Sequence, residues 1–284
     1  MYVINVINIS GGCGKSTTTT NLASSFAKKG YRTLCIDADG QASATDNLAD
    51  VGVSLSYKEL QTLDDMIAPD NSNFFSVLAD NLCEEINRDL SRVLKRPKTI
   101  RSAILKTGIE NLDLLPASLD LINSSKDLTD DMTRSAVNRL EDAFREIEGD
   151  YDFVFIDNSP SQNIVSTNTM LVSDFNIIPI KIDRKSIKGM LLTLQSLQTI
   201  MENNDRDYDF KILFTMKNRN KNDDKTIEWF KSHIPDLIFD TVIPYQAKPN
   251  SDASLMNKLV IDSDSNVGNT YKQLCEELLS IVSK

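Results

Sequence analysis

Residues that bind metals or form disulfides are scarce in this sequence. It has one histidine and four cysteines, and the cysteines, Cys13, Cys35, Cys83 and Cys275, are scattered with no C-x-x-C pair. That scatter excludes a disulfide framework and the usual zinc or iron–sulfur ligand spacings. Unpaired cysteines fit a reducing compartment, so we expect a cytoplasmic protein.

Long hydrophobic runs and an excess of positive charge are missing as well. No apolar run approaches the ~20 residues that cross a bilayer. The apolar first residues follow no basic stretch, so we expect neither a membrane association nor a signal peptide. The net charge of −10 argues against a generally basic nucleic-acid-binding surface, but it leaves room for a local basic patch.

The chain does contain enough apolar material for one large α/β domain spanning residues 1–284. Its 284 residues are 40% hydrophobic and 25% charged, and no linker rich in Gly, Ser or Pro divides them. Short apolar runs alternate with helical patterns. We expect strands at 3–9, 32–36, 111–115, 152–156, 175–180, 210–216 and 238–243, and helices at 16–29, 133–148, 186–202, 223–233 and 267–282.

Continuous apolar strands that alternate with helices predict a mostly parallel twisted sheet with helices on both faces. Ligands of such sheets bind at the carboxyl ends of the strands. The segment 49–106 is polar and only partly helical, and we interpret it as a less regular insertion or cap.

A glycine-rich segment joins the first predicted strand to the first predicted helix. Glycines let the backbone close around an anion, and the N–H groups at a helix N-terminus point at it. Lys15 can reach the β- and γ-phosphates of a nucleotide, and the Ser16 hydroxyl can take a Mg²⁺ position. The sequence therefore predicts a phosphate site formed by Gly11, Gly12, Cys13, Gly14, Lys15, Ser16 and Thr17.

The spacing of this segment differs from the ordinary Walker A motif, G-x-x-x-x-G-K-[ST], because Ile9 stands at the first glycine. It resembles instead the deviant Walker A motif, K-G-G-x-G-K-[ST], of the ParA/MinD superfamily of P-loop NTPases. Ser10 replaces the signature lysine, which in that family reaches across a nucleotide-sandwich dimer to the partner's phosphates. Lys181 and Arg184 are candidates to replace it.

A second motif follows the second predicted strand. Asp37 and Asp39 leave that strand at positions i and i+2, which suits Mg²⁺-bound waters and an attacking water. The segment 37–45 resembles the ParA motif D-x-D-P-Q-x-x-A-T, with Gly40 in place of proline. The resemblance implies that Asp39 positions the hydrolytic water and that Asp37 holds the Mg²⁺ shell.

A third motif is the apolar segment 151–157, which ends in Asp157 as a Walker B strand does, where the carboxylate binds a magnesium-ligated water. It resembles the family's Y-D-x-x-x-I-D-x-P-P-S. Segments 111–118, 175–190 and 241–244 also resemble the family, so the likeness covers nearly the whole chain. Pro244 precedes a loop that lies by the adenine in relatives, and Met216, Lys217 and Asn218 are further adenine candidates from their place after a strand.

The resemblance implies a slow, Mg²⁺-dependent, partner-stimulated ATPase that partitions plasmid or chromosomal DNA. Such a protein forms an ATP-dependent homodimer, binds DNA without sequence preference, works with a centromere-binding ParB-like protein and associates with the nucleoid when ATP is bound. DNA binding needs Lys and Arg on one surface. The candidates are Arg184, Lys185 and Lys188 at a helix start, and a second group formed by Arg88, Arg92, Lys95, Arg96, Lys98, Arg101 and Lys106.

Two other functions remain open. A nucleotide-gated binding module with little turnover is suggested by the absence of the signature lysine at Ser10. A MinD-like membrane-cycling ATPase needs a basic amphipathic C-terminal helix. The segment 271–284 is acidic at its centre, so this second alternative ranks lower. An iron–sulfur reductase of the same superfamily is excluded by the placement of the cysteines.

Overall fold

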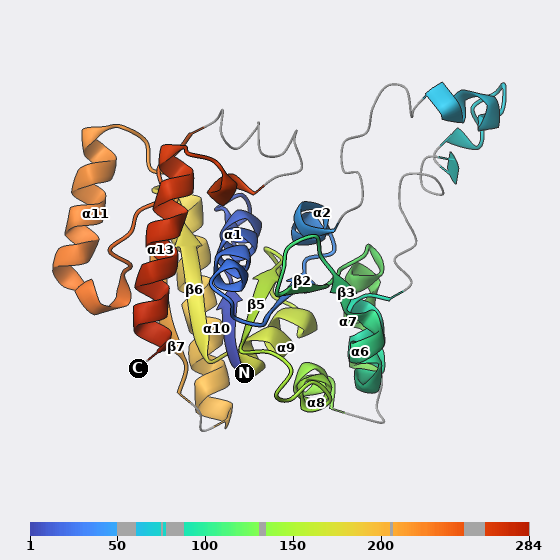
Figure 1. Ribbon diagram of the computed structural model, residues 1–284, viewed down its shortest axis with the longest axis horizontal. Helices are drawn as coiled ribbons and strands as arrows, with labels where there is room; N and C mark the ends of the chain where they lie inside the picture. Colours follow the sequence, from blue (N-terminus) through green and yellow to red (C-terminus); the bar gives the residue numbers. More distant parts are fainter. Residues whose placement is uncertain are drawn as a thin grey trace.

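A mostly parallel sheet forms the centre of the molecule (Figure 1). The computed structural model describes residues 1–49, 61–74, 76–77, 88–130, 135–204, 207–246 and 259–283. Within them the strand order is β3-β4-β2-β5-β1-β6-β7. The strands are β1 (Tyr2–Val6), β2 (Thr33–Ala38), β3 (Leu105–Lys106), β4 (Leu112–Leu115), β5 (Phe153–Asn158), β6 (Phe175–Ile180) and β7 (Asp209–Phe214). Only the short edge strand β3 is antiparallel, so the predicted fold class is confirmed.

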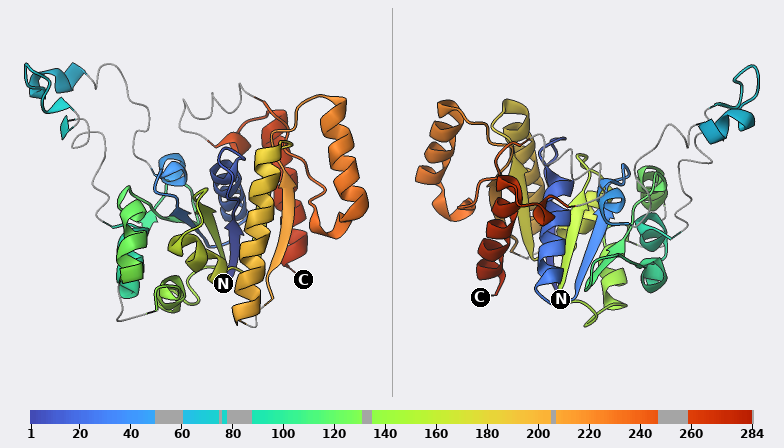
Figure 2. Two further views of the ribbon diagram at one scale, coloured as in Figure 1. Left: turned by 180° about the vertical axis from the view of Figure 1, so that it is seen from behind. Right: turned by 45° about the horizontal axis from the view of Figure 1, so that its top comes forward.

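Helices cover both faces of this sheet. They are α1 (Lys15–Lys28), α2 (Ser43–Leu48), α5 (Leu90–Lys95), α6 (Ile100–Ala103), α7 (Asp120–Asp130), α8 (Arg139–Arg145), α9 (Ile164–Val172), α10 (Arg184–Asn204), α11 (Lys221–His233) and α13 (Asn266–Val282). Figure 1 shows α1 and α13 on one face, and the left view of Figure 2 shows α8, α9 and α10 on the other. No helix of the described ranges is long and apolar enough to cross a membrane.

Burial explains why the central strands are mostly apolar. Every residue of β2, β5 and β6 is buried, as expected for parallel strands covered on both sides. Phe26 of α1 packs edge-on against Phe153 and Phe155 of β5, with ring centroids 4.8 and 5.0 Å apart. This packing fixes α1 against the sheet and holds its N-terminus at the carboxyl end of β1.

Two predicted elements differ in the structure. The helix predicted at 133–148 is shorter, because α8 begins at Arg139 and ends at Arg145, and residues 131–134 lie outside the described ranges. Asn168 of α9 explains the late start, since its side chain donates to the carbonyl of Ala136 and accepts from the N–H of Leu140. These bonds occupy backbone groups that an earlier helical turn would have used.

The strand predicted at 238–243 is also wrong as a strand. That segment runs beside β7, but it forms no regular ladder with it: Ile238 makes an isolated bridge to Ile212, and Ile243 donates its N–H to the Phe214 carbonyl. A second isolated bridge, from Pro244 to Lys217, lies just past the ends of both segments. By contrast, residues 88–106 are more ordered than their composition suggests. Leu90, Val93, Leu94 and Ile100 are fully buried in the core cluster that covers β2 and β5.

Candidate nucleotide-binding site

The loop between β1 and α1 has the backbone of an anion site. Gly12 (φ 68°) and Gly14 (φ 84°) both adopt the left-handed conformation that glycine tolerates best. Gly14 is also the N-cap of α1, and no side chain caps that helix. The uncapped helix start therefore offers its first N–H groups and its dipole to a bound anion.

Lys15 lies buried beneath this loop, with only 6% of its surface exposed. Its ammonium donates to the Ser10 carbonyl at 3.0 Å, and the Cys13 thiol contacts the same oxygen at 3.3 Å. Within the described ranges this carbonyl is the one hydrogen-bond acceptor of the ammonium, and a buried ammonium on a neutral acceptor gains from an anionic partner. The geometry therefore suits a phosphate bound over the loop.

Two carboxylates meet beside the loop at the carboxyl edge of the sheet. The register of β2 and β5 pairs Asp37 with Asp157, and both are completely buried. Asp37 is well satisfied, since Oδ2 accepts from the N–H and hydroxyl of Thr45 at 2.7 and 2.8 Å and Oδ1 accepts from the N–H of Asp39 at 3.0 Å. Asp157 is not, because its Oδ2 has no hydrogen-bond partner in the described part of the chain.

The electrostatics of Asp37 and Asp157 favour the binding of a cation. Burial raises the pKa of Asp157 well above its usual value, and the charge of Asp37 raises it further, against the opposing effects of Ser16 and Lys15. Burial likewise raises the pKa of Asp37 to about 6. Adjacent buried carboxylates are costly to ionise without a compensating positive charge.

A Mg²⁺ ion fits these residues. The carboxyl group of Asp157, whose Oδ2 has no hydrogen-bond partner in the described ranges, interacts with Ser16, the first hydroxyl after the phosphate-loop lysine. Mg²⁺ usually takes one or two carboxylates and completes its shell with phosphates and water, so one carboxylate and one hydroxyl beside a phosphate loop are sufficient protein ligands.

Comparison with known proteins agrees with this site. The AAA_31 family, described as an AAA domain, matches residues 1–212. The chain belongs to the AAA_31 family. The sporulation initiation inhibitor protein Soj of Bacillus subtilis is 26% identical over 97% of both chains. The chromosome partitioning protein ParA of Caulobacter vibrioides is 26% identical over 99% of this chain and 94% of its own. The resemblance to ParA-type proteins is thereby confirmed.

Solved structures share the fold. The cobyrinic acid a,c-diamide synthase of Mycobacterium smegmatis, with a bound ATP analogue and magnesium, gives a TM-score of 0.75 at 20% identity, covering 100% of this chain and 96% of its own. A plasmid partition protein of Borrelia burgdorferi bound to AMPPNP gives 0.73 at 23% identity, covering 99% of both chains. Such different activities on one fold mean that function must be argued from the site.

The second motif of this AAA_31 protein lies at the rim of the site. Asp39 is partly exposed, and its Oδ1 accepts from the N–H of Gln41 at 3.0 Å. The glycine that replaces the family's proline lies under the start of α7. A Cβ at Gly40 would come within 2.6 Å of Cγ1 of Ile122. Glycine at position 40, where the ParA motif has proline, therefore leaves room for the side chain of Ile122.

The candidate adenine residues gather on the other side of the loop. The Met216 methyl lies 3.6 Å from the position that a Cβ on Gly14 would take, and Pro244 bridges to Lys217. Lys217 forms an ion pair with Asp224 at 2.6 Å. The N–H of Asn218 bonds to Asp223. The structure brings these residues together near the phosphate loop, and their contact with adenine stays a prediction.

Two polar residues that the sequence reasoning missed hold the loop in place. Asn8 donates to the Pro179 carbonyl at 2.7 Å and accepts from the N–H of Ser10 at 2.8 Å. The Thr215 hydroxyl donates to the Cys13 carbonyl at 2.8 Å. Both residues lie within two positions of the end of a strand, but nothing in their local sequence marks them as residues that hold the loop.

The two groups of basic residues differ in how they are paired. Arg184, Lys185 and Lys188 are exposed at the start of α10, and none of them forms an ion pair within the described ranges. In the second group three residues form ion pairs with acids: Lys95 with Asp127, Arg101 with Asp150, and Lys106 with Asp113. All three basic residues at the start of α10 are therefore available to an anionic partner, whereas half of the six exposed cations of the second group other than Arg92 are paired with acids.

Proposed function

We propose that this chain is the ATP-dependent switch of a plasmid or chromosome partition system. It binds ATP with Mg²⁺, forms a homodimer in that state and hydrolyses ATP slowly. The ATP-bound dimer binds DNA without sequence preference, so the protein is cytoplasmic and associates with the nucleoid. A centromere-binding, ParB-like protein stimulates hydrolysis, and hydrolysis releases the dimer from DNA.

One observation carries the proposal. Buried Asp157, which has an unpartnered oxygen in the described ranges, interacts with Ser16 at the start of α1, where the buried ammonium of Lys15 donates to the Ser10 carbonyl of the loop. This arrangement suits the binding of a nucleoside triphosphate together with its metal ion. End-to-end similarity to partitioning proteins supports the cellular role.

The residues divide the chemistry between them. When bound, Mg²⁺ neutralises charge that develops on the phosphates. Lys15 and the N–H groups from Gly11 to Thr17 hold the phosphates in line. Ser16 and Asp157 orient the metal's coordination shell, while Asp37 fixes the loop that carries Asp39. Asp39, at the exposed rim, orients the attacking water.

A second candidate function is a nucleotide-gated binding module with little turnover. Ser10 favours it, because its side chain carries no charge where the family motif has a lysine. The two functions share the nucleotide site and differ in hydrolysis. Turnover that stays at background with every DNA and partner tested would favour the second.

The molecular mass of the protein, measured by light scattering with each nucleotide, tests whether ATP drives dimerisation. We expect a monomer with ADP and a dimer with ATP and Mg²⁺. A Ser10→Lys variant serves as comparison, since it restores the family motif. A monomer in every state that becomes a dimer only after Ser10→Lys would show that the wild-type chain does not complete the cycle.

DNA binding is tested with two variants of equal charge change. Replacing Arg184, Lys185 and Lys188 by alanine should lower the affinity for random-sequence DNA and reduce the salt slope by about 3, one unit for each lost phosphate contact. The matched control replaces Arg88, Arg96 and Lys98, which are also exposed. A larger loss in the control would place the DNA surface on the second group instead.

A further inference from the structure

The signature position of the phosphate loop carries no charge in this chain. Ser10 is 5% exposed, and its N–H is bonded to Asn8. Helix α10 closes over it, since a Cβ on Gly189 would lie 2.8 Å from the Cβ of Ser10. The first atoms of any side chain at position 10 therefore lie in a sterically restricted space against α10.

A different lysine approaches the same loop from the neighbouring strand. Lys181 directly follows β6, which pairs with β1 in the sheet. Its Nζ lies 3.6 Å from the point that a Cβ on Gly12 would occupy, and, apart from Gly12 and its two chain neighbours, no other atom of the described residues lies within 4 Å of that point. Gly12 is one of the glycines of the predicted phosphate site, so this ammonium lies at the open side of the loop.

The backbone of Lys181 is fixed relative to the loop. Asn8 ties the loop to Pro179, and Thr215 donates its N–H to the Ile180 carbonyl at 2.8 Å and its hydroxyl to the Cys13 carbonyl. The N–H of Lys181 itself donates to the Ser186 hydroxyl at 2.9 Å. Only the side chain of Lys181 is left to move toward a ligand.

The charge of this lysine is unused within the protein. Its ammonium forms no ion pair and no hydrogen bond in the described ranges, although the side chain is partly buried. Its field reaches the centre of the loop: burial raises the pKa of the Cys13 thiol, and the charges of Lys15 and Lys181 oppose that rise. A partly desolvated cation without a partner, aimed at an anion loop, fits a phosphate oxygen.

We propose that Lys181 binds the terminal phosphate of the nucleotide from within the same chain, and there supplies the positive charge that Ser10 lacks. The inference rests on the proposed ATP binding. It makes each subunit's phosphate site complete in itself. Arg184, the other candidate for this role, is exposed on α10 and no contact places it at the loop.

Nucleotide binding to Lys181→Ala tests the proposal. We expect the affinity for AMPPNP with Mg²⁺ to fall by about 10- to 100-fold, the usual effect of losing a bond from a charged donor. The affinity for ADP should fall by less than about threefold, because ADP lacks the terminal phosphate. Retained ADP binding also shows that the variant folds. Lys181→Arg should recover most of the AMPPNP affinity, and Lys225→Ala, an exposed site on α11, should match wild type.

The outcomes separate this inference from the proposed function. Wild type that binds AMPPNP no better than Lys181→Ala overturns the inference alone. Wild type that binds neither nucleotide overturns the proposed function and this inference with it. An equal loss of ADP and AMPPNP affinity in Lys181→Ala also overturns the inference, since it indicates damage to the whole loop.

A mixing experiment decides whether the lysine acts within its own chain. Lys181→Ala is combined with Lys15→Ala, which contributes an intact Lys181 but a damaged phosphate loop. Hydrolysis should stay at the level of Lys181→Ala alone. Recovery toward the wild-type rate in the mixture would mean that the lysine crosses the dimer, and would overturn the same-chain assignment.

Discussion

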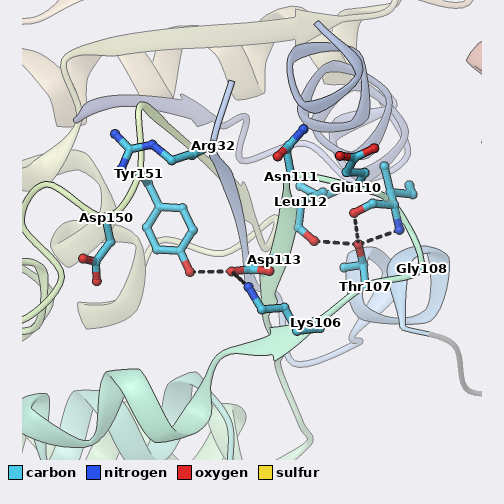
Figure 3. Close-up of a pocket in the computed structure, with 11 residues that line it drawn as sticks. Arg32, Lys106, Thr107, Gly108, Glu110, Asn111, Leu112, Asp113, Asp150 and Tyr151 are labelled. Atoms are coloured by element: carbon cyan, nitrogen blue, oxygen red, sulfur yellow. Dashed lines mark hydrogen bonds and ion pairs between the residues drawn. The ribbon is translucent and has the colours of Figure 1, made fainter. Parts of the chain in front are cut away.

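Charged side chains gather at both ends of the sheet, but at one end they are paired with one another and at the other end they are not. At the amino ends of β2 and β4 there is a hollow of about 760 Å³ lined by charged and polar residues (Figure 3). There Asp113 accepts from Lys106 at 2.9 Å and from the Tyr151 hydroxyl at 2.8 Å. Arg32 is paired with Asp152 at 2.7 Å. These charges are already satisfied by one another.

At the carboxyl ends the charges lack such partners. Asp157 has a free oxygen, Lys15 contacts only a carbonyl, and Lys181 is unpaired among the residues described. The hollow at the amino ends is therefore the less reactive of the two sites. Buried polar groups without partners are costly unless a ligand satisfies them, so they mark a binding site better than volume does.

Removing one lysine from each end gives the largest expected contrast. Lys15→Ala should lower ATP hydrolysis by about 100- to 1000-fold, since it deletes a pre-placed donor to the reacting phosphates. Lys106→Ala removes the same charge from a side chain that is 86% exposed. Its hydrolysis rate should stay within about twofold of wild type. Phosphate release under saturating ATP measures both, and equal losses in the two variants would erase the contrast.

The stability of the metal-free protein should depend on pH because of the carboxyl-end pair. The folded pKa of Asp37, about 6, lies above its ordinary value. The folded state therefore holds this proton more tightly, and the stabilisation is complete below about pH 4 and lost as pH rises through 6. The free energy of unfolding should fall over that window by at most roughly 3 kcal/mol.

Urea unfolding at pH 5 and pH 7.5, without nucleotide or Mg²⁺, measures this dependence. Asp157→Asn is the control, because it removes the titration of Asp157, whose pKa is raised by burial and by the charge of Asp37, and so should reduce the difference between the two pH values. It should also stabilise the metal-free protein at pH 7.5 by roughly 0.5–2 kcal/mol while abolishing hydrolysis. A wild type whose pH dependence equals that of Asp157→Asn would show that the pair is not electrostatically strained.

The sequence predicts the parts of the fold that depend on local pattern. The apolar strands and the charged residues at their ends are visible as short runs, and β2, β5 and β1 lie side by side, so the three motifs meet as expected. The resemblance to ParA also gives the roles assigned to Asp37, Asp39 and Asp157, which remain predictions.

Features that depend on contacts between distant segments were not predictable. Asn5 donates to Asn176, and Asn158 donates to Asn5, which forms a buried polar ladder across β5, β1 and β6. In the sequence these are isolated asparagines with no periodic signal. The approach of Lys181 to Gly12 likewise depends on the order of β1 and β6, which no local pattern encodes. The wrong prediction of a strand at 238–243 has the same cause, because its apolar pattern does not reveal that it pairs with β7 through an isolated bridge and not through a regular ladder.

The smallest expected effect comes from a single hydroxyl at the amino end. Burial, followed by the bond to Asp113, raises the pKa of Tyr151, so the phenol stays protonated and donates. Tyr151→Phe keeps the ring and should lower the free energy of unfolding by about 0.5–1.5 kcal/mol, the usual net value of one hydrogen bond. Urea midpoints at an unchanged slope would measure it, with hydrolysis equal to wild type. Unchanged stability together with a several-fold loss of hydrolysis would mean that this end also serves the reaction, and that satisfied charges do not distinguish the two ends.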